Sequence, residues 1–350
     1  MRRALLVAML AVAACGGPSA PVGLGPSPGQ SEVGSGSRTS PTRTPTTSQT
    51  LICRLPVVWD VATGTQVVSK AGFLHFPDEQ VVEDPSAPAG STFFDRASSS
   101  WLPVTREAVS PSGAQYAYTE GSTFLNTPGR LHVVDVATKV DRVIYAGPIV
   151  YRVVDFAHEG IYLTLDAGEG PNVGLWLQNP AGGPARLISS AIQAPAVGGG
   201  AAWGEDFNPS DPNPPPGGLA GARNRIERMD LNTGTTTAWF YHPGAYVSVA
   251  GFDAQGAPFV SVDSPTPSDP NANDDTEELW LATSPASASR LFSGRRSDPW
   301  PESLAAIDGY GIWFDGYKSS IWLYSKNSVT IEAQPKLDQL QIAGGCIKTS

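Results

Sequence analysis

A short apolar strand recurs along the sequence and constrains the fold more than any other feature. Each copy has three to five residues, several copies end in an acidic or amide residue, and a turn of small residues follows. The seven copies are Val57–Asp60, Thr92–Asp95, Leu131–Asp135, Leu175–Asn179, Ile226–Asp230, Leu279–Leu281 and Ile321–Leu323. With anchors at positions 60, 95, 135, 179, 230, 283 and 325, the mean interval is about 44 residues. A fixed period of this length indicates one repeated supersecondary unit.

A second unit, which reads as strand, Gly-containing turn and strand, lies between these anchors and predicts a β-hairpin. The clearest copy is Val109–Tyr118, and looser copies are Val154–Leu163, Gly251–Val260 and Ala306–Phe314. Helix is nearly absent, because no window shows a sustained 3.6-residue apolar stripe with capping residues. The Leu-Trp-Leu triplets are apolar on both strand faces, as expected where neighbouring sheets cover each sheet. We therefore predict an all-β fold, a single β-propeller of four-stranded blades over residues 51–350. A pair of β-sandwiches is the alternative.

The turn Ser110-Pro111-Ser112-Gly113 resembles the Ser-Pro-Asp-Gly hairpin of TolB-type (WD40-like) β-propeller repeats, with Ser112 in place of the Asp. One copy is clean, and the resemblance is diffuse over most of residues 51–350. As a whole the chain is also similar to propeller lipoproteins of environmental bacteria. These resemblances imply the propeller fold and imply no activity.

Pairing of the two ends of the domain is expected to close the propeller. Five units look complete, over residues 105–147, 148–193, 194–244, 245–298 and 299–334. The segment Leu340–Cys346 has the character of an inner strand, and Cys53–Lys70 would supply the rest of its blade. Residues 71–104 would then form a short seventh blade, so seven blades are preferred and six are possible. Cys53 and Cys346 fall in the shared blade and are expected to form a disulfide in an oxidising compartment. Two free thiols are the alternative.

The N-terminal residues predict where the protein resides. Residues 1–14 combine two arginines with an apolar run, as in a secretory signal peptide. The ending Val12-Ala13-Ala14-Cys15 resembles the lipobox of bacterial lipoproteins, which implies lipid attachment to Cys15. An ordinary signal peptide that happens to contain a cysteine is the alternative. Gly, Pro, Ser and Thr occupy 26 of the 35 positions from Gly16 to Thr50, so residues 15–50 are expected to be a lipidated cysteine and a disordered tether. We thus expect an extracytoplasmic domain that contacts a bacterial membrane or cell surface through a lipid anchor.

Composition argues against several function classes. The formal charge of −10 provides no cationic surface for a phosphate backbone, so nucleic acid is not an expected partner. The domain has no Gly-x-Ser-x-Gly, no His-Glu-x-x-His, no Walker loop and no dinucleotide glycine fingerprint. We therefore predict no catalytic residue and prefer a non-enzyme.

Loop lengths point to one face of the propeller. Connections between the second and third strands of the blades are long, whereas turns between the third and fourth strands are tight, and long loops in a compact domain are usually functional or disordered. The candidate binding residues lie on the two longest loops: Glu205, Asp206, Asp211, Arg223, Arg225, Asp269, Asp274 and Asp275.

Calcium is a possible ligand of the second loop but is not favoured. The segment Asp269-x-Asn271-x-Asn273 starts like an EF-hand loop, yet Asp274 takes the place of the glycine at position six and Trp280 that of the glutamate at position twelve. Solvated acidic loops are the preferred interpretation, and neither a metal nor a cofactor is predicted.

Three functions are compatible with these features. We favour a membrane-tethered module that binds a protein, peptide or glycan on its long-loop face. The alternative is an envelope hydrolase or lyase that uses carboxylates at the propeller axis, and a third option is a structural envelope component. Buried carboxylates with a His or Arg partner at the axis would favour catalysis, whereas glycine and apolar residues there would favour binding.

Overall fold

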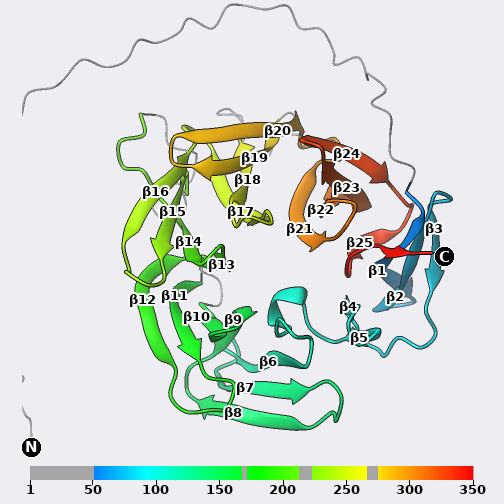
Figure 1. Cartoon of the computed structure of the whole chain (residues 1–350), viewed down its shortest axis with the longest axis horizontal. Coiled ribbons are helices and arrows are strands. Elements are labelled where there is room, and N and C mark those ends of the chain that lie inside the picture. Colours follow the sequence, from blue (N-terminus) through cyan, green and yellow to red (C-terminus); the bar gives the residue numbers. More distant parts are fainter. Residues whose placement is uncertain (1–50, 168–171, 213–222, 266–274, 350) are drawn as a thin grey trace, which may run out of the picture. The chain divides into compact units, whose positions relative to one another are not determined.

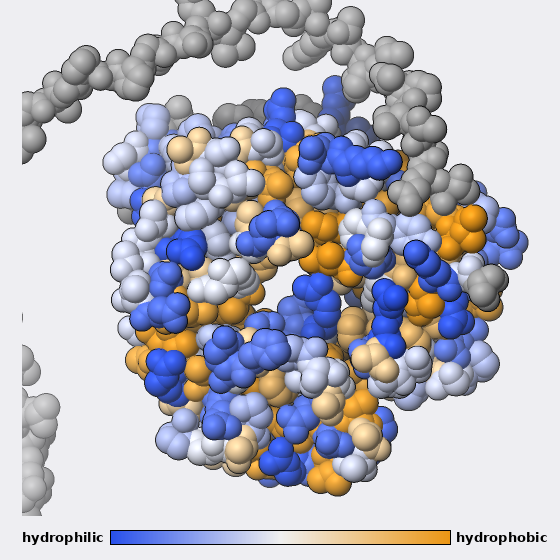
Figure 2. Space-filling model, viewed as in Figure 1, coloured by the Kyte–Doolittle hydropathy of each residue, from blue (hydrophilic) through white to orange (hydrophobic). Residues whose placement is uncertain are grey.

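The computed structural model describes residues 51–167, 172–212, 223–265 and 275–349, in which β-strands are nearly the only regular secondary structure. Six antiparallel sheets surround a central opening as the blades of a β-propeller (Figure 1). The opening persists in the space-filling view (Figure 2). The predicted all-β propeller is confirmed. No helix in the described ranges has the length and apolar character needed to cross a bilayer.

The blades follow one another along the chain, and Figure 1 shows the first strand of each four-stranded blade nearest the opening. Blade 1 contains β25 (Asp338–Ile342), β1 (Cys53–Thr63), β2 (Gln66–Phe76) and β3 (Gln80–Glu83), and β26 (Ile347–Lys348) also pairs with β1. Blade 2 contains β6 (Gln115–Ser122), β7 (Thr127–Asp135) and β8 (Asp141–Gly147), and Val109 adds a bridge to Tyr116. Blade 3 contains β9 (Tyr151–Ala157), β10 (Gly160–Leu165), β11 (Val173–Gln178) and β12 (Arg186–Gln193).

The remaining blades have the same order of four strands. Blade 4 contains β13 (Ala196–Gly198), β14 (Ala201–Asp206), β15 (Arg225–Asp230) and β16 (Thr236–Tyr241). Blade 5 contains β17 (Tyr246–Phe252), β18 (Pro258–Ser264), β19 (Thr276–Ser284) and β20 (Ser287–Arg295). Blade 6 contains β21 (Pro301–Ile307), β22 (Ile312–Gly316), the 3₁₀ turn η2 (Tyr317–Ser319), β23 (Ser320–Ser325) and β24 (Ser328–Ala333). The five units predicted as complete therefore correspond to blades 2 to 6.

The hydrophobic core lies between successive blades. Trp203 of blade 4 packs with Val247 and Val260 of blade 5 in one buried cluster. The rings of Phe259 in blade 5 and Phe314 in blade 6 meet edge to face, with centroids 5.1 Å apart. Burial of each such side chain stabilises the fold by about 2 kcal/mol. Because a middle strand contacts a blade on each side, it is apolar on both faces, as the Leu-Trp-Leu triplets predicted.

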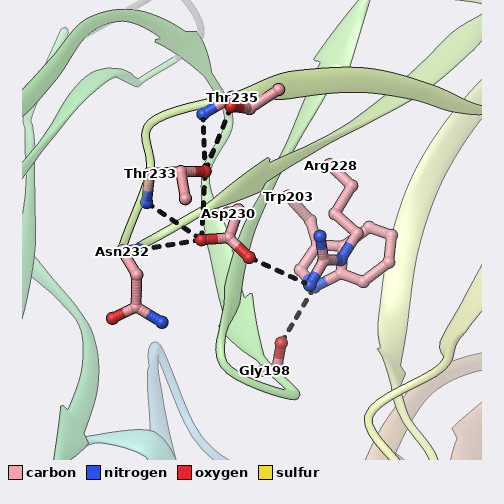
Figure 3. A network of polar contacts seen from close by, with 7 residues as sticks. All are labelled: Gly198, Trp203, Arg228, Asp230, Asn232, Thr233 and Thr235. Atoms are coloured by element: carbon pink, nitrogen blue, oxygen red, sulfur yellow. Dashed lines mark hydrogen bonds and ion pairs between the residues drawn. The ribbon is translucent and has the colours of Figure 1, made fainter.

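The acidic or amide residue that ends the recurring strand caps the turn that follows. Figure 3 shows Asp230 at the end of β15, where one carboxylate oxygen accepts the backbone N–H groups of Asn232 and Thr233, each at 3.0 Å. Asp135 accepts the N–H of Thr138 in the corresponding turn of blade 2. Such bonds to the ionised carboxylate lower the pKa of both aspartates. This part of the repeat is therefore structural and belongs to the turn.

The two ends of the domain close the ring in blade 1, as predicted. β25 pairs with β1 through Val57↔Ile342 and Val58↔Gln341. A disulfide joins Cys53 to Cys346 across 293 positions of sequence, with a Cα–Cα distance of 5.8 Å. Both cysteines are buried. The strand pairing and the disulfide expected from the sequence are confirmed.

The preferred seventh blade is not formed, and the alternative of six blades describes the structure. β1 and β2 form a long hairpin that pairs without a break from Cys53↔Phe76 to Thr63↔Gln66, and β3 extends it to Glu83. These strands complete blade 1. What remains before blade 2 is a two-stranded ribbon, β4 (Phe93–Asp95) and β5 (Ser100–Leu102), followed by the 3₁₀ turn η1 (Arg106–Ala108). Figure 1 shows this ribbon between blades 1 and 2.

The first two copies of the repeat differ from the later copies in their strand position. Val57–Asp60 lies in β1, which is the second strand of its blade, whereas the later copies lie in third strands. Thr92–Asp95 belongs to the ribbon. An apolar strand that ends in Asp looks the same in both contexts, so the local pattern did not distinguish them.

Because successive strands of each blade are antiparallel, the connections between strands lie on two opposite faces of the propeller. The face that carries the ends of second and fourth strands, and the starts of first and third strands, is called the long-loop face. The opposite face, called the short-turn face, carries turns such as His158–Glu159 between β9 and β10. The start of β1 at Cys53 and the short strand β26 both lie at the short-turn face. The long-loop face is therefore opposite both ends of the described domain.

Candidate binding cleft

A cavity of about 680 Å³ opens on the long-loop face across blades 4, 5 and 6. Its polar and aromatic lining comes from the strand ends that meet at this face: Glu205, Arg223, Tyr246, Ser248, Ser261, Asp263, Glu277, Arg296, Trp300, Glu302 and Tyr317. We call this cavity the blade 4–6 cleft. Four of these residues carry carboxylates and two carry guanidinium groups.

Arg296 organises the blade 5 wall of the cleft. Its Nε donates to Glu277 at 2.8 Å, and its side chain also forms ion pairs with Asp275, at 3.2 Å, and with Asp263. Its backbone N–H donates to the carbonyl oxygen of Asp275 at 2.8 Å. The side chains of Asp275 and Glu277 are almost completely buried. One arginine, directly after β20, thus holds three carboxylates at the end of β18 and the start of β19.

The single positive charge of Arg296 cannot neutralise all three neighbouring carboxylates. Burial raises the pKa of Glu277 to about 7, and the charges of Asp263 and Asp275 add to this effect against the opposing influence of Arg296. Burial also raises the pKa of Asp263, although Arg296 opposes the change. The wall can therefore exchange a proton near neutral pH.

The blade 4 wall contains two of the predicted residues. Glu205, at the end of β14, forms an ion pair with Arg223. Burial raises the pKa of Glu205, and Arg223 partly offsets this. Both residues line the cleft, so the structure brings this part of the sequence prediction into one site.

Other predicted residues lie outside the blade 4–6 cleft. Arg225 forms ion pairs with Asp206 and with Glu227, the latter at 2.8 Å. Asp206 and Glu227 line a smaller cavity of about 100 Å³ beside β12. Asp211 is buried, and it accepts a hydrogen bond from Nδ2 of Asn224 at 2.6 Å. That contact secures the start of the loop.

The second predicted loop is described only at its end. Asp275 contacts Arg296 in the wall, whereas Asp269, Asp274 and the calcium-like segment lie outside the described residues. Within the described ranges, no group of three or more His, Cys, Asp or Glu side chains is arranged to hold a metal ion.

The sequence-based selection missed Arg296, Trp300, Glu302 and Tyr317. Arg296 follows β20, Trp300 and Glu302 flank the start of β21, and Tyr317 follows β22. The connection from the fourth strand of one blade to the first strand of the next shares the long-loop face. Attention to these short connections, and not only to the long loops, would have pointed to them.

A second cavity, of about 940 Å³, lies beside the first and shares Glu302 and Tyr317 with it. It extends over blade 6 to Asp338 and Leu340 of β25, and we call it the closure cleft. Asp315 lies in its wall and accepts the backbone N–H of Ile342 at 2.5 Å. Burial raises the pKa of Asp315 to about 7, although that N–H opposes the change. The two clefts together span blades 4, 5 and 6 and the closing strand.

The central channel has a mixed lining. The first strands of blades 3 to 6 and η1 surround a cavity of about 340 Å³, with Val249, Gly251, Phe252 and Leu304 among its residues. Arg106, Glu107 and Asp155 also line it, and they border another cavity, of about 470 Å³, that includes His158 of the short-turn face.

Asp155 is the carboxylate of this channel with the clearest electrostatic perturbation. Burial raises its pKa to about 6, Glu107 adds to this effect and Arg106 opposes it. The channel therefore combines the apolar and glycine lining expected for binding with one perturbed carboxylate near an arginine.

Comparison with known proteins finds similar solved structures. No family model and no curated protein matches the sequence. Similar solved structures include TolB from Acinetobacter baumannii, at 12% identity over 83% of this chain and 67% of that chain, with a TM-score of 0.45. An oligogalacturonate lyase in complex with manganese shares 12% identity over 79% of this chain and 73% of that chain, with a TM-score of 0.42. The acylaminoacyl peptidase of Pyrococcus horikoshii shares 8% identity over 80% of this chain and 44% of that chain, with a TM-score of 0.44.

Proposed function

We propose that this β-propeller is a binding module that receives an extended segment of a protein or peptide on its long-loop face. The observation that carries the proposal is the pair of adjoining clefts, which share Glu302 and Tyr317 and extend from blade 4 to the closing strand. Two adjoining clefts with aromatic and charged walls suit a chain-like ligand, for which a few polar contacts fix orientation.

The placement of the chain ends supports the same proposal. Cys53 and β26 lie at the short-turn face, which is opposite the clefts. We further propose that residues 15–50 connect the propeller to a membrane through a lipid on Cys15, outside the cytoplasm. Stable anchoring requires more than one acyl chain.

The anchor is tested by Cys15→Ala. The variant should move from the membrane fraction to the soluble fraction on cell fractionation, because the site of lipid attachment is gone. Cys15→Ala that stays in the membrane fraction to the same extent as wild type would contradict the anchor and leave the cleft proposal standing.

The binding face is tested by filling the cleft. Ser248 is exposed in β17 and lines the blade 4–6 cleft, so Ser248→Trp should block it without disturbing the core. Ser69→Trp places the same side chain on the exposed part of β2 and serves as the control. With the full chain as bait in solubilised native envelope, wild type and Ser69→Trp should capture the same stoichiometric protein, and Ser248→Trp should lose it. Equal capture by all three, or no reproducible protein with wild type, would contradict the proposal.

Asp155 supports a second candidate function, an envelope hydrolase or lyase acting at the propeller axis. Its raised pKa and its proximity to Arg106 and Glu107 meet part of the condition set out above for catalysis, with one half-buried carboxylate near an arginine. Purified wild-type protein would then degrade an envelope polymer, and Asp155→Asn would not. Equal product release by both proteins would reject this candidate.

A further inference from the structure

The carboxylates that line the blade 4–6 cleft differ in their partners. Glu205 is paired with Arg223, and Asp263 and Glu277 are paired with Arg296. Glu302 differs from all of them, because no side chain among the described residues forms an ion pair or a hydrogen bond with it. Burial by itself raises the pKa of Glu302. The half-buried Glu302 carboxylate thus lines a cleft without an ion-pair partner among the described residues, whereas the two arginines of that cleft are paired with other acids.

The position of Glu302 makes this carboxylate accessible to a ligand. Glu302 lies near the start of β21 and lines both the blade 4–6 cleft and the closure cleft. A ligand group in either cleft could therefore contact Glu302. Partial burial strengthens its attraction for a cation relative to that of a fully exposed carboxylate.

Aromatic rings accompany Glu302 in the same wall. The ring centroids of Trp300 and Tyr317 are 6.4 Å apart, and the N–H of Tyr317 donates to the carbonyl oxygen of Trp300 at 2.9 Å. Tyr246 lines the cleft as well. The neighbouring cation, Lys318, donates from Nζ to the carbonyl oxygen of Ser297 at 2.5 Å, and the same Nζ lies 5.6 Å from the ring centroid of Tyr317. The rings therefore stand beside a carboxylate that this lysine does not neutralise.

We propose that Glu302 binds the ammonium or guanidinium group of a lysine or arginine side chain in the ligand, with the rings of Tyr246 and Trp300 around it. The inference rests on the proposed binding function and names the class of its ligand. A carboxylate supplies the ionic contact, and an aromatic face attracts a cation through its quadrupole. An acidic ligand would instead meet an uncompensated negative charge.

The test uses the full chain and a defined probe. Binding of fluorescein-labelled hexalysine is measured by fluorescence anisotropy at low salt, with hexalysine acetylated on every side chain as the uncharged counterpart. Glu302→Gln keeps the shape of the side chain and removes its charge. Glu332→Gln makes the same change at a partly exposed residue of β24, outside both clefts, and controls for net charge. Melting curves establish that both variants remain folded.

Hexalysine should bind wild type and Glu332→Gln equally and bind Glu302→Gln about tenfold more weakly, while the acetylated peptide should bind none of them well. Equal affinity for Glu302→Gln and wild type would overturn the role of Glu302. Failure of hexalysine to bind wild type would overturn the cationic class of ligand. Neither outcome bears on the envelope capture with Ser248→Trp, so failure of this inference is distinguishable from failure of the binding function.

Discussion

At the scale of single residues, two aspartates of blade 6 fix the C-terminal segment to the ring. Asp308 accepts the backbone N–H of Cys346 at 2.6 Å and the indole N–H of the buried Trp313 at 2.8 Å. Asp315 accepts the N–H of Ile342. A buried N–H without an acceptor costs about 1–3 kcal/mol, so these contacts help to determine where the closing strand docks.

Asp315 should make stability depend on pH. Its pKa is raised from 3.8 to about 7 in the folded protein, mainly by burial, so between these values the folded state retains a proton that the unfolded chain releases. Stability then falls as pH rises from about 4 to about 7. Each unit of difference between the folded and unfolded pKa corresponds to about 1.4 kcal/mol, which gives a loss on the order of a few kcal/mol.

Melting temperatures at pH 5 and pH 8 test this expectation. Wild type should melt at a lower temperature at pH 8, and Asp315→Asn should shrink the difference, because the amide cannot ionise and still accepts the N–H of Ile342. Asp78→Asn, in the exposed turn after β2, is the matched control and should behave like wild type. An unchanged pH dependence in Asp315→Asn would show that other groups cause it.

At the scale of elements, close approach between neighbouring blades determines which residues the inner strands carry. Gly251 of β17 has a φ of +146°, and a Cβ there would lie 2.3 Å from the Cβ of Leu304 in β21. The innermost strands of neighbouring blades lie close together near the axis. Where the next blade is in contact with such a strand, only glycine fits.

Gly251→Ala should therefore destabilise the propeller by about 2–4 kcal/mol, through overpacking against Leu304 and backbone strain. Urea unfolding at equilibrium measures the change. Gly309→Ala is the control, since a Cβ at that turn would meet no atom within 4 Å. Equal stability of the two variants would show that blades 5 and 6 can separate without cost.

At the scale of the whole molecule, the ring is closed by strand pairing and by the disulfide. The bond between Cys53 and Cys346 closes a loop that contains all six blades. On the chain-entropy model, a loop of this length gives about 5 kcal/mol as an upper figure. Because β25 also pairs with β1 by hydrogen bonds, loss of the disulfide leaves a second means of closure.

The double variant Cys53→Ser/Cys346→Ser should fold but melt at a lower temperature than wild type, with a loss of stability of up to about 5 kcal/mol. Scanning calorimetry without reductant measures the shift. Titration of thiols in the unfolded protein provides a separate check, because the bridged pair should not react until a reductant is added. Two reactive thiols in untreated protein, or an unchanged melting temperature, would contradict the role of the bridge.

Several features of the fold could be predicted from local spacing along the sequence. The 44-residue period, the turn-capping aspartates and the two-sided apolar strands follow from hydrogen bonding and burial within one blade, so they indicated an all-β propeller and the limits of blades 2 to 6. The same pattern at both chain ends predicted closure and the cysteine pair.

The blade number and the composition of the cleft depend on contacts between residues far apart in the sequence. Because β1 pairs with β2 without a break, strands that were assigned to a seventh blade belong to blade 1. The apolar pattern of a strand does not show which other strand pairs with it. Arg296 and Glu302 entered the cleft because connections from different blades meet on one face. These connections meet because the closed ring is curved. The residues that it brings together have no regular spacing in the sequence.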